Sequence, residues 1–173
     1  MSYCIRHARQ DELGLLAGIE TDAGQRFAEV GLSEIAEHPP ASTAYVRAFL
    51  RGGAILIAAD EHDRPVGYAL TGFIDHAGHL FELSVHRAHG KQGLGTRLVN
   101  AACGFCFAQG ARRITLSTFR DVQWNAPFYA KLGFRILPQD DWTPGLFILR
   151  MREEDGGLPM DRRCFMEKEL NEN

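Results

Sequence analysis

The sequence has few of the features that mark membrane proteins or nucleic-acid-binding proteins. No apolar run approaches the ~18 residues of a transmembrane helix, and the first residues lack the apolar core of a secretion signal. The net charge is −3, and lysine and arginine do not cluster as they do in a domain that binds nucleic acid. We therefore expect a cytoplasmic protein that acts without a membrane and without nucleic acid.

Cysteines are also few, and their spacing does not suit a metal site. Of the four cysteines, Cys103 and Cys106 form a C-x-x-C pair, but no second C-x-x-C and no H-x-x-x-H is present. Zinc would need that second ligand pair, and a thioredoxin-like pair would stand at the start of a helix. These two cysteines fall in the middle of a helical pattern, so we expect core thiols and no metal.

Length and composition suit one enzyme-sized domain. The chain has 173 residues, within the ~100–200 residues that are common for a domain. Its hydrophobic content of 45% is normal for a globular protein. We find no internal repeat, low-complexity tract or linker, so we predict a single domain over residues 1–173.

Strand and helix patterns alternate along the chain, which predicts an α/β fold. Strands are expected at residues 2–8, 54–59, 66–73, 79–85, 113–119, 134–137 and 163–170, the last as an edge strand. Helices are expected at residues 11–23, 42–50, 94–108, 125–132 and 142–154. The acidic segment 20–40 shows no regular pattern, and His38-Pro39-Pro40 marks a break.

Three glycines stand close together after an apolar segment that ends at Val85. Gly90, Gly93 and Gly95 lead directly into an amphipathic helix pattern, and backbone N–H groups in such a connection bind anions, most often phosphates. The spacing G-x-x-G-x-G differs from the dinucleotide pattern, and no Gly-Lys-Ser/Thr is present for a nucleoside triphosphate. We predict a phosphate-bearing ligand at residues 85–97; a plain turn with glycine at positive φ stays open.

A second motif follows at residues 125–134, N-A-P-F-Y-A-K-L-G-F. Asn125 is typical of a helix N-cap, Pro127 of a first turn and Gly133 of a helix end. Together with V-H-R-A-H-G-K-Q-G-L-G at residues 85–95, this motif resembles the GNAT superfamily of acyl-CoA-dependent N-acyltransferases. The resemblance implies a mixed, splayed β-sheet of about seven strands flanked by helices.

The resemblance also implies acetyl-CoA as co-substrate. Its pyrophosphate would lie on backbone N–H groups of residues 90–96 and its pantetheine arm along residues 83–85, with the Val85 N–H facing the thioester oxygen. The implied contact residues are Leu83, Ser84, Val85, Gly90, Lys91, Gln92, Gly93, Leu94, Gly95, Thr96, Asn125, Phe128 and Tyr129.

Two positions depart from the family pattern. Gly90 stands where the family usually has Arg or Gln, and Arg87 stands where it often has Pro. Gly90 leaves the charge pairing with phosphate to Lys91 or Arg97. These departures put in question which side chain contacts the pyrophosphate. They do not affect the contacts expected from the backbone N–H groups.

Two residues are candidates for proton transfer. Tyr129 is our candidate for the acid that protonates the departing thiolate; its alternative role is to pack on the cofactor arm. Glu82 is our candidate for the base that deprotonates the ammonium; its alternative role is that of a solvated carboxylate on a strand. His79 and His86 are lesser alternatives for the base.

The acceptor is expected to be a primary amine of a small molecule or peptide. Phe27 and Trp124 are the candidate acceptor contacts, and the acidic residues near Phe27 would suit a cationic amine. The alternative function is a non-catalytic sensor module that binds acyl-CoA and needs neither Tyr129 nor Glu82. A homodimer through an edge strand at residues 163–170 is also considered.

Overall fold

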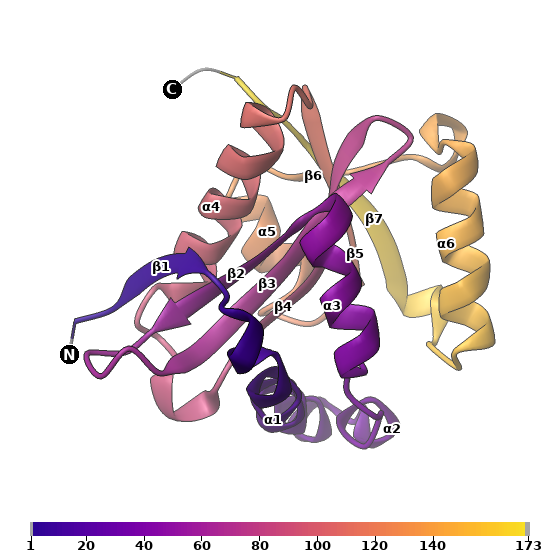
Figure 1. The fold of residues 1–173 in the computed structure, drawn as a ribbon. Coiled ribbons are helices and arrows are strands. Elements are labelled where there is room, and N and C mark those ends of the chain that lie inside the picture. Colours follow the sequence, from indigo (N-terminus) through magenta and orange to yellow (C-terminus); the bar gives the residue numbers. More distant parts are fainter. Residues whose placement is uncertain (1, 172–173) are drawn as a thin grey trace. The chain divides into compact units, whose positions relative to one another are not determined.

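The computed structural model describes residues 2–171 and contains a mixed seven-stranded sheet flanked by helices (Figure 1). The strand order is β1-β2-β3-β4-β5-β7-β6. The strands are β1 (Cys4–His7), β2 (Ala54–Ala59), β3 (Pro65–Ile74), β4 (Ala77–Val85), β5 (Arg113–Phe119), β6 (Arg135–Ile136) and β7 (Arg163–Glu169). The predicted fold class is therefore confirmed.

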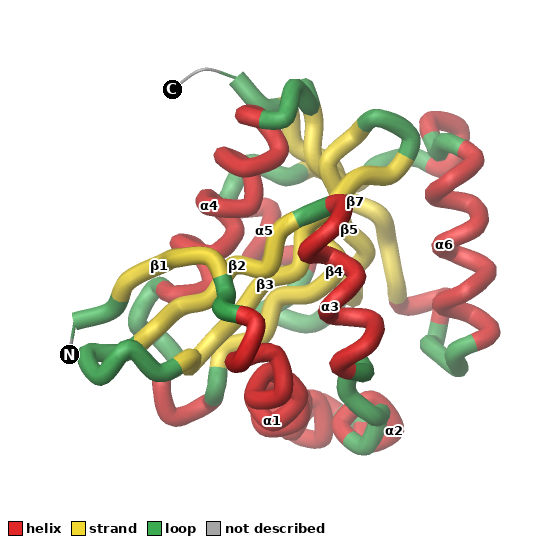
Figure 2. Tube along the Cα trace, in the orientation of Figure 1, coloured by secondary structure: helices red, strands yellow, loops and turns green. Residues whose placement is uncertain are grey.

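Helices connect most of the strands (Figure 2). The α-helices are α1 (Leu13–Gly24), α2 (Ser33–Ala36), α3 (Thr43–Gly52), α4 (Leu94–Ala108), α5 (Ala126–Lys131) and α6 (Pro144–Asp155). Short 3₁₀ turns are η1 (Gln10–Glu12), η2 (Gln25–Val30), η3 (Arg87–His89), η4 (Gln139–Asp141) and η5 (Met160–Arg162). Within residues 2–171, none of these helices is long and apolar enough to cross a bilayer.

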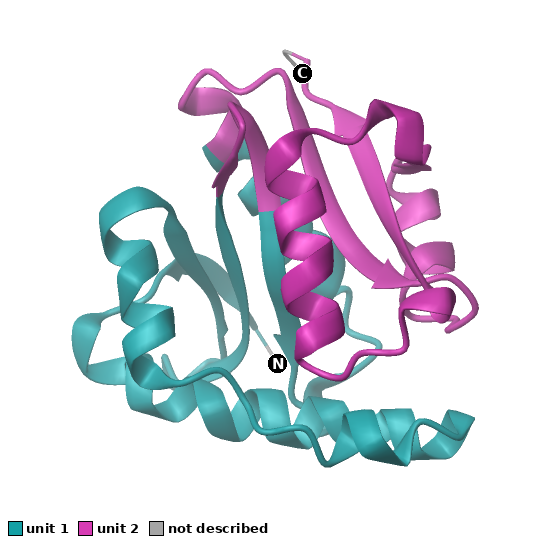
Figure 3. Ribbon diagram, turned by 90° about the vertical axis from the view of Figure 1, so that its right-hand side faces the viewer, with its two compact units in different colours: residues 1–72, 80–105 teal, residues 73–79, 106–173 magenta. Residues whose placement is uncertain are grey.

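The chain forms two compact units (Figure 3). Unit 1 comprises Met1–Gly72 and Leu80–Phe105, and unit 2 comprises Phe73–His79 and Cys106–Asn173. In unit 1, helices α1 and α3 pack on one face of β2 and β3 (Figure 1). The buried residues of this core are Leu13, Leu16, Ile19, Val46, Phe49, Ile55, Ile57, Ala59, Tyr68 and Leu70.

The other face of β2 in unit 1 is covered as well. All six residues of β2 are buried, although alternate residues point to opposite faces. His7 is paired with Leu56 across β1 and β2, and its ring lies 6.3 Å from the ring of Phe105 in α4. Helix α4 therefore lies on the Leu56 face, which explains why this strand is apolar throughout.

In unit 2, strand β7 lies between β5 and β6. Arg113 to Phe119 pair antiparallel with Glu169 to Arg163, and Arg135 and Ile136 pair with the other side of β7. The prediction that residues 163–170 form an edge strand is therefore wrong. The argument for a dimer through that edge is lost as well, because β6 covers it. Helix α6 covers β7 through a small core of Leu137, Leu146 and Phe165 with Ile74, Trp142 and Leu149.

Some boundaries agree with the sequence prediction, others differ by one or two residues, and the largest departures are at segment 25–36 and at β6. Strands β2 and β5 have the predicted ends, and Ser42 caps α3 by accepting a hydrogen bond from the Tyr45 N–H at 3.2 Å. The segment 25–36 was expected to be irregular but forms η2 and α2. Strand β6 is two residues long, because its flank Leu137 turns into the core of unit 2. Cys103 and Cys106 are buried, as expected for core thiols.

Candidate active site

The glycine loop of unit 1 has a backbone suited to an anion. It runs from the end of β4 through η3 to the first residue of α4, Leu94. Lys91 and Gly93 have positive φ values of 60° and 72°, with Gln92 between them. When the sign of φ alternates between neighbouring residues, their N–H groups point into one concavity. The first N–H groups of a helix also lack intrahelical acceptors. The Gly90 N–H already donates to the carbonyl of Arg87 at 3.0 Å, so residues 91–96 are those whose backbone N–H groups can hold a phosphate group.

Gly90 has a different role from the one its loop position suggests. Its φ is −63°, so positive φ is not the reason for glycine at this position. A Cβ at residue 90 would lie 3.1 Å from the carbonyl oxygen of Arg87, a tight contact with the backbone of η3. Glycine at position 90 thus lets η3 close compactly, while Lys91 adopts the left-handed conformation beside it.

The cations near this loop differ in their availability. Arg87 is paired with Asp22 of α1, and the Arg97 guanidinium donates to the carbonyl of Tyr3 at 2.9 Å. Within the described residues 86–97, Lys91 is the exposed cation that has neither an ion pair nor a hydrogen bond. Of the two cations that the sequence left open for phosphate, Lys91 is therefore the less engaged, while Arg97 keeps its charge and has one donor bonded to a neutral carbonyl.

Glu82 and Ser84 lie on one face of β4 in unit 1, two residues apart. The Ser84 hydroxyl donates a hydrogen bond to Oε1 of Glu82 at 2.7 Å. Residues 81–83 and Val85 are half-buried, whereas almost all of β3 is buried. Glu82 is therefore an oriented carboxylate in a partly accessible strand rather than a fully solvated one.

A buried phenol lies within the electrostatic reach of Glu82. The Tyr68 hydroxyl donates to Oε2 of Glu20 at 2.5 Å, and the Glu20 carboxylate also accepts from the Ala41 N–H at 3.1 Å. Burial raises the pKa of Tyr68 far above its usual range, and the negative charges of Glu82 and Glu20 raise it further. Tyr68 therefore stays protonated and acts as a fixed donor.

Aromatic rings extend from this group to the surface of unit 1. The ring of Phe81 lies 5.0 Å from that of Phe49, which lies 5.3 Å from that of Tyr45, both pairs edge to face. Tyr45 is 47% exposed, so the row reaches solvent. Phe27, the predicted acceptor contact in this unit, is half-buried in η2.

The second motif forms an aromatic cluster in unit 2. Tyr129 is buried in α5, with its ring 5.0 Å from that of Phe128 and 5.7 Å from that of Phe134. Asn125 is the N-cap residue, but its side chain makes no capping hydrogen bond, contrary to the simplest expectation from the sequence. Trp124, the predicted acceptor contact of this unit, is half-buried directly before it.

His79, a lesser candidate for the base, has a structural role. It is 2% exposed, and its Nδ1 lies 2.7 Å from Oγ1 of Thr115, whose hydroxyl donates to the carbonyl of Gly78. Burial lowers the pKa of His79 to about 3, so the ring is neutral. His86, the other candidate, has Nδ1 3.2 Å from the Ala88 N–H and caps η3.

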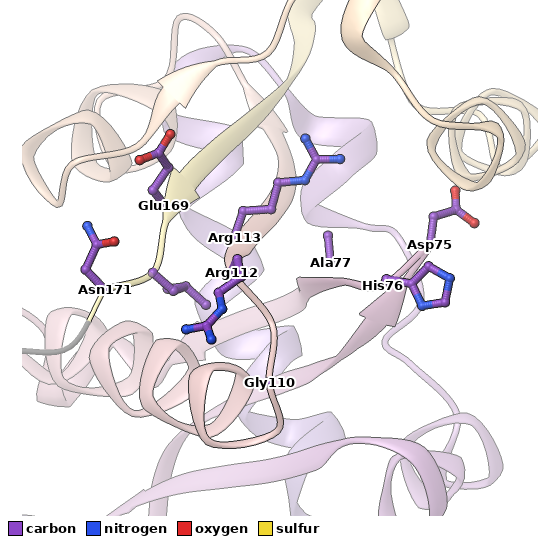
Figure 4. Close-up of a pocket in the computed structure, with 9 residues that line it drawn as sticks. Asp75, His76, Ala77, Gly110, Arg112, Arg113, Glu169 and Asn171 are labelled. Atoms are coloured by element: carbon purple, nitrogen blue, oxygen red, sulfur yellow. The ribbon is translucent and has the colours of Figure 1, made fainter.

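An open hollow of about 840 Å³ in unit 2 contains none of the predicted site residues (Figure 4). Its lining combines the turn at Asp75 and His76 with Arg112, Arg113 and the chain end near Glu169. Both acidic and basic side chains line it, and Arg113 is paired with Glu167. Across residues 2–171, no group of three His, Cys, Asp or Glu side chains is placed to hold a metal ion.

The structure assigns each predicted residue to one unit. Unit 1 holds the glycine loop, Leu83 to Val85 of β4, Glu82 and Phe27, and unit 2 holds Trp124 and residues 125–129. The sequence analysis missed two contacts, Tyr68 with Glu20 and Arg87 with Asp22. The sequence does indicate that Tyr68 has a partner, because a tyrosine inside an apolar strand needs a hydrogen-bond partner. Nothing in the sequence indicates the contact of Arg87 with Asp22.

Comparison with known proteins gives the same fold. The PaiA N-acetyltransferase of Thermoplasma acidophilum, solved with coenzyme A, has a TM-score of 0.69 at 19% identity and covers 98% of this chain and 99% of its own. The ribosomal-protein-S18-alanine N-acetyltransferase of Escherichia coli has a TM-score of 0.67 at 17% identity, covering 99% and 96%. The model of the acetyltransferase (GNAT) family matches residues 27–134, more than half of the sequence, so this chain belongs to the GNAT family of acetyltransferases.

Proposed function

We propose that this protein is an N-acetyltransferase that moves the acetyl group of acetyl-CoA to a primary amine by direct attack. The observation that carries the proposal is the loop of unit 1, where Lys91 and Gly93 at positive φ precede the N-terminus of a 15-residue helix. Family membership supports acetyl transfer, and a complex of the similar PaiA N-acetyltransferase contains coenzyme A. The residues present therefore fit this co-substrate.

The proposed cofactor contacts divide into backbone and side-chain roles. Backbone N–H groups within residues 90–96, other than that of Gly90, hold the pyrophosphate, and Lys91 supplies a charge that Arg87, paired with Asp22, does not. Leu83, Ser84 and Val85 guide the pantetheine arm along β4, and the Val85 N–H faces the oxygen on which negative charge develops. In unit 2, Asn125, Phe128 and Tyr129 contact the arm.

Proton transfer in the proposal uses one carboxylate and one phenol. Glu82 accepts the proton of the acceptor ammonium, directly or through a water, and the hydrogen bond from Ser84 keeps its carboxylate oriented. The nitrogen of the neutral amine then bonds to the thioester carbonyl carbon, the carbon–sulfur bond breaks, and the Tyr129 hydroxyl gives its proton to the thiolate. The second proton leaves the nitrogen of the new amide and restores the Tyr129 phenol through solvent, while Glu82 releases its proton to solvent. Free coenzyme A and the acetylated amine are the products.

The acceptor in the proposal is a small-molecule or peptide amine. Phe27 and Trp124, both half-buried, are the proposed apolar contacts of the acceptor. The carboxylates Glu20 and Glu82, together with the aromatic row that ends at the exposed Tyr45, favour a cationic acceptor. Glu20 accepts hydrogen bonds from Tyr68 and Ala41 inside the core, whereas Glu82 lies in the half-buried part of β4 and is the carboxylate proposed to meet the reacting nitrogen.

Mass spectrometry of an amine panel incubated with acetyl-CoA tests the proposal. We expect one class of amine to gain the mass of one acetyl group, with the product lost for Glu82→Gln and retained for Glu61→Gln, an exposed acid in the turn before β3. If no amine is acetylated while acetyl-CoA binds, the acceptor lies outside the panel, the acyl group is a different one, or the protein is an acyl-CoA-binding sensor module.

A further inference from the structure

We propose that Asp22 is a positioning residue that holds the glycine loop in its cofactor-binding conformation from helix α1. The inference rests on the proposed function of that loop and adds to it a residue that lies far away in the sequence. All groups involved belong to unit 1.

Three hydrogen bonds join Asp22 to the first residue of η3. The Arg87 backbone N–H donates to Oδ2 of Asp22 at 2.7 Å, and the guanidinium donates through Nε and Nη2 to Oδ1, both at 3.2 Å. Asp22 thus clamps main chain and side chain together. The clamp lies at the point where the chain leaves β4 and enters the loop.

The main-chain bond is the part that fixes the backbone. It can form because residue 87 is not a proline, which would have no N–H to donate. A backbone N–H bonded to a carboxylate is a charge-assisted hydrogen bond, stronger than a neutral one. The guanidinium contacts are exposed to solvent, with 46% of the Arg87 side chain accessible, so they add less.

The position of Asp22 also argues for a role beyond helix stability. It lies in the last turn of α1, where the helix dipole disfavours a negative charge. Burial also works against ionisation of Asp22 by raising its pKa. The hydrogen bonds from Arg87 outweigh this effect, helped by the charge interaction with nearby His86, so the pKa of Asp22 lies below its usual range. The carboxylate is therefore ionised at neutral pH, and Arg87 offsets a charge that would otherwise repel phosphates.

Helix α1 is a firm support for such a clamp. Leu13, Leu16 and Ile19 are buried in the core of unit 1, and Glu20 is bonded to Tyr68 of β3 and to Ala41. The loop is therefore tied to a helix that cannot easily shift. A loop held in its bound conformation has less conformational freedom to lose when the ligand binds.

Hydrogen exchange and calorimetry on Asp22→Ala test the proposal. Without ligand, we expect faster amide exchange in residues 86–93 of the variant and unchanged exchange in β2. Titration with coenzyme A should give about five- to tenfold weaker binding, with a similar rise in KM for acetyl-CoA and little change in kcat or in KM for the amine. Arg87→Ala, which keeps the backbone N–H, should show a smaller effect, and Glu61→Ala should show none.

Separate outcomes overturn the inference and the proposed function. Unchanged exchange in residues 86–93, or coenzyme A binding as tight as in the wild type, would show that Asp22 does not position the loop. An equal rise in both KM values with a lowered Tm would show a general structural role instead. If the wild type does not bind coenzyme A while exchange in the variant is faster, the clamp stands and the proposed function fails.

Discussion

The Tyr68 hydroxyl donates a hydrogen bond to Glu20 across 48 residues of sequence, and it does so from a side chain with 0% exposure. The bond joins β3 to α1 inside the core of unit 1. Because the phenol is kept protonated by burial and by the two nearby carboxylates, it donates at every pH at which the protein is folded.

Tyr68→Phe should destabilise unit 1 without removing much apolar contact. The change removes the phenol donor to Oε2 of Glu20 and leaves the Ala41 N–H as the donor to both carboxylate oxygens. Loss of a buried hydrogen bond to a charged group costs about 1–3 kcal/mol. Urea denaturation followed by circular dichroism measures the difference in the free energy of unfolding. A variant as stable as the wild type would mean that water replaces the phenol at no cost.

Glu82→Gln should lower kcat about 10²-fold if Glu82 is the general base. A base acts in its ionised form, so the wild-type rate should fall at low pH, and this acid limb should be absent in the variant. Ser84→Ala removes the 2.7 Å hydrogen bond and should move the acid limb to higher pH, because that bond favours the carboxylate. An acid limb that is the same in wild type and Glu82→Gln assigns the base elsewhere.

Stability should fall below neutral pH because of His79. Burial lowers its pKa to about 3 in the folded protein, whereas a histidine in an unfolded chain titrates near ~6.5. Between these values the unfolded state binds a proton that the folded state does not. The free energy of unfolding should therefore decrease as pH falls, by about 1.4 kcal/mol per pH unit.

Urea denaturation of wild type and His79→Gln between about pH 6.5 and 5 checks this slope. The variant loses the titrating ring, so its stability should change less with pH over this range, whatever its stability at neutral pH. Parallel slopes in the two proteins would show that His79 is not the group responsible.

Two glycines of unit 1 should respond to alanine in opposite directions. A Cβ on Gly53 would lie 2.1 Å from the carbonyl oxygen of Thr71, so Gly53→Ala should destabilise by about 1–3 kcal/mol. Gly104 lies within α4 and a Cβ there meets nothing within 4 Å, so Gly104→Ala should stabilise by about 0.4–1 kcal/mol. Thermal denaturation of both variants measures the change in Tm, which should be a decrease for Gly53→Ala and an increase for Gly104→Ala. Changes of the same sign would contradict the geometry.

The sequence predicts those elements whose signals are local. β2 is an apolar run and β5 begins with alternating polar and apolar residues, and the ends of both strands agree with the structure. The glycine loop and the N-cap position of Asn125 were likewise found from neighbouring residues. Segment 25–36 was missed because its short helical turns are too brief to show a periodic apolar stripe.

Features that depend on distant residues escaped prediction. The place of β7 inside the sheet follows from its pairing with β6, which no pattern within residues 163–170 encodes. The contact of Asp22 with Arg87 joins residues 65 positions apart, and only the folded backbone brings them together. The burial of His79 also depends on the partner that Thr115 provides.

Release of free thiol from acetyl-CoA, measured for wild type and Tyr129→Phe with the amine that the panel identifies, tests the central claim most directly. If Tyr129 protonates the departing thiolate, the variant should lose about 10²-fold in kcat while it binds coenzyme A as tightly as the wild type. Turnover that is nearly unchanged in the variant would contradict the acid role of Tyr129. No thiol release from wild type with any amine would contradict acetyl transfer itself.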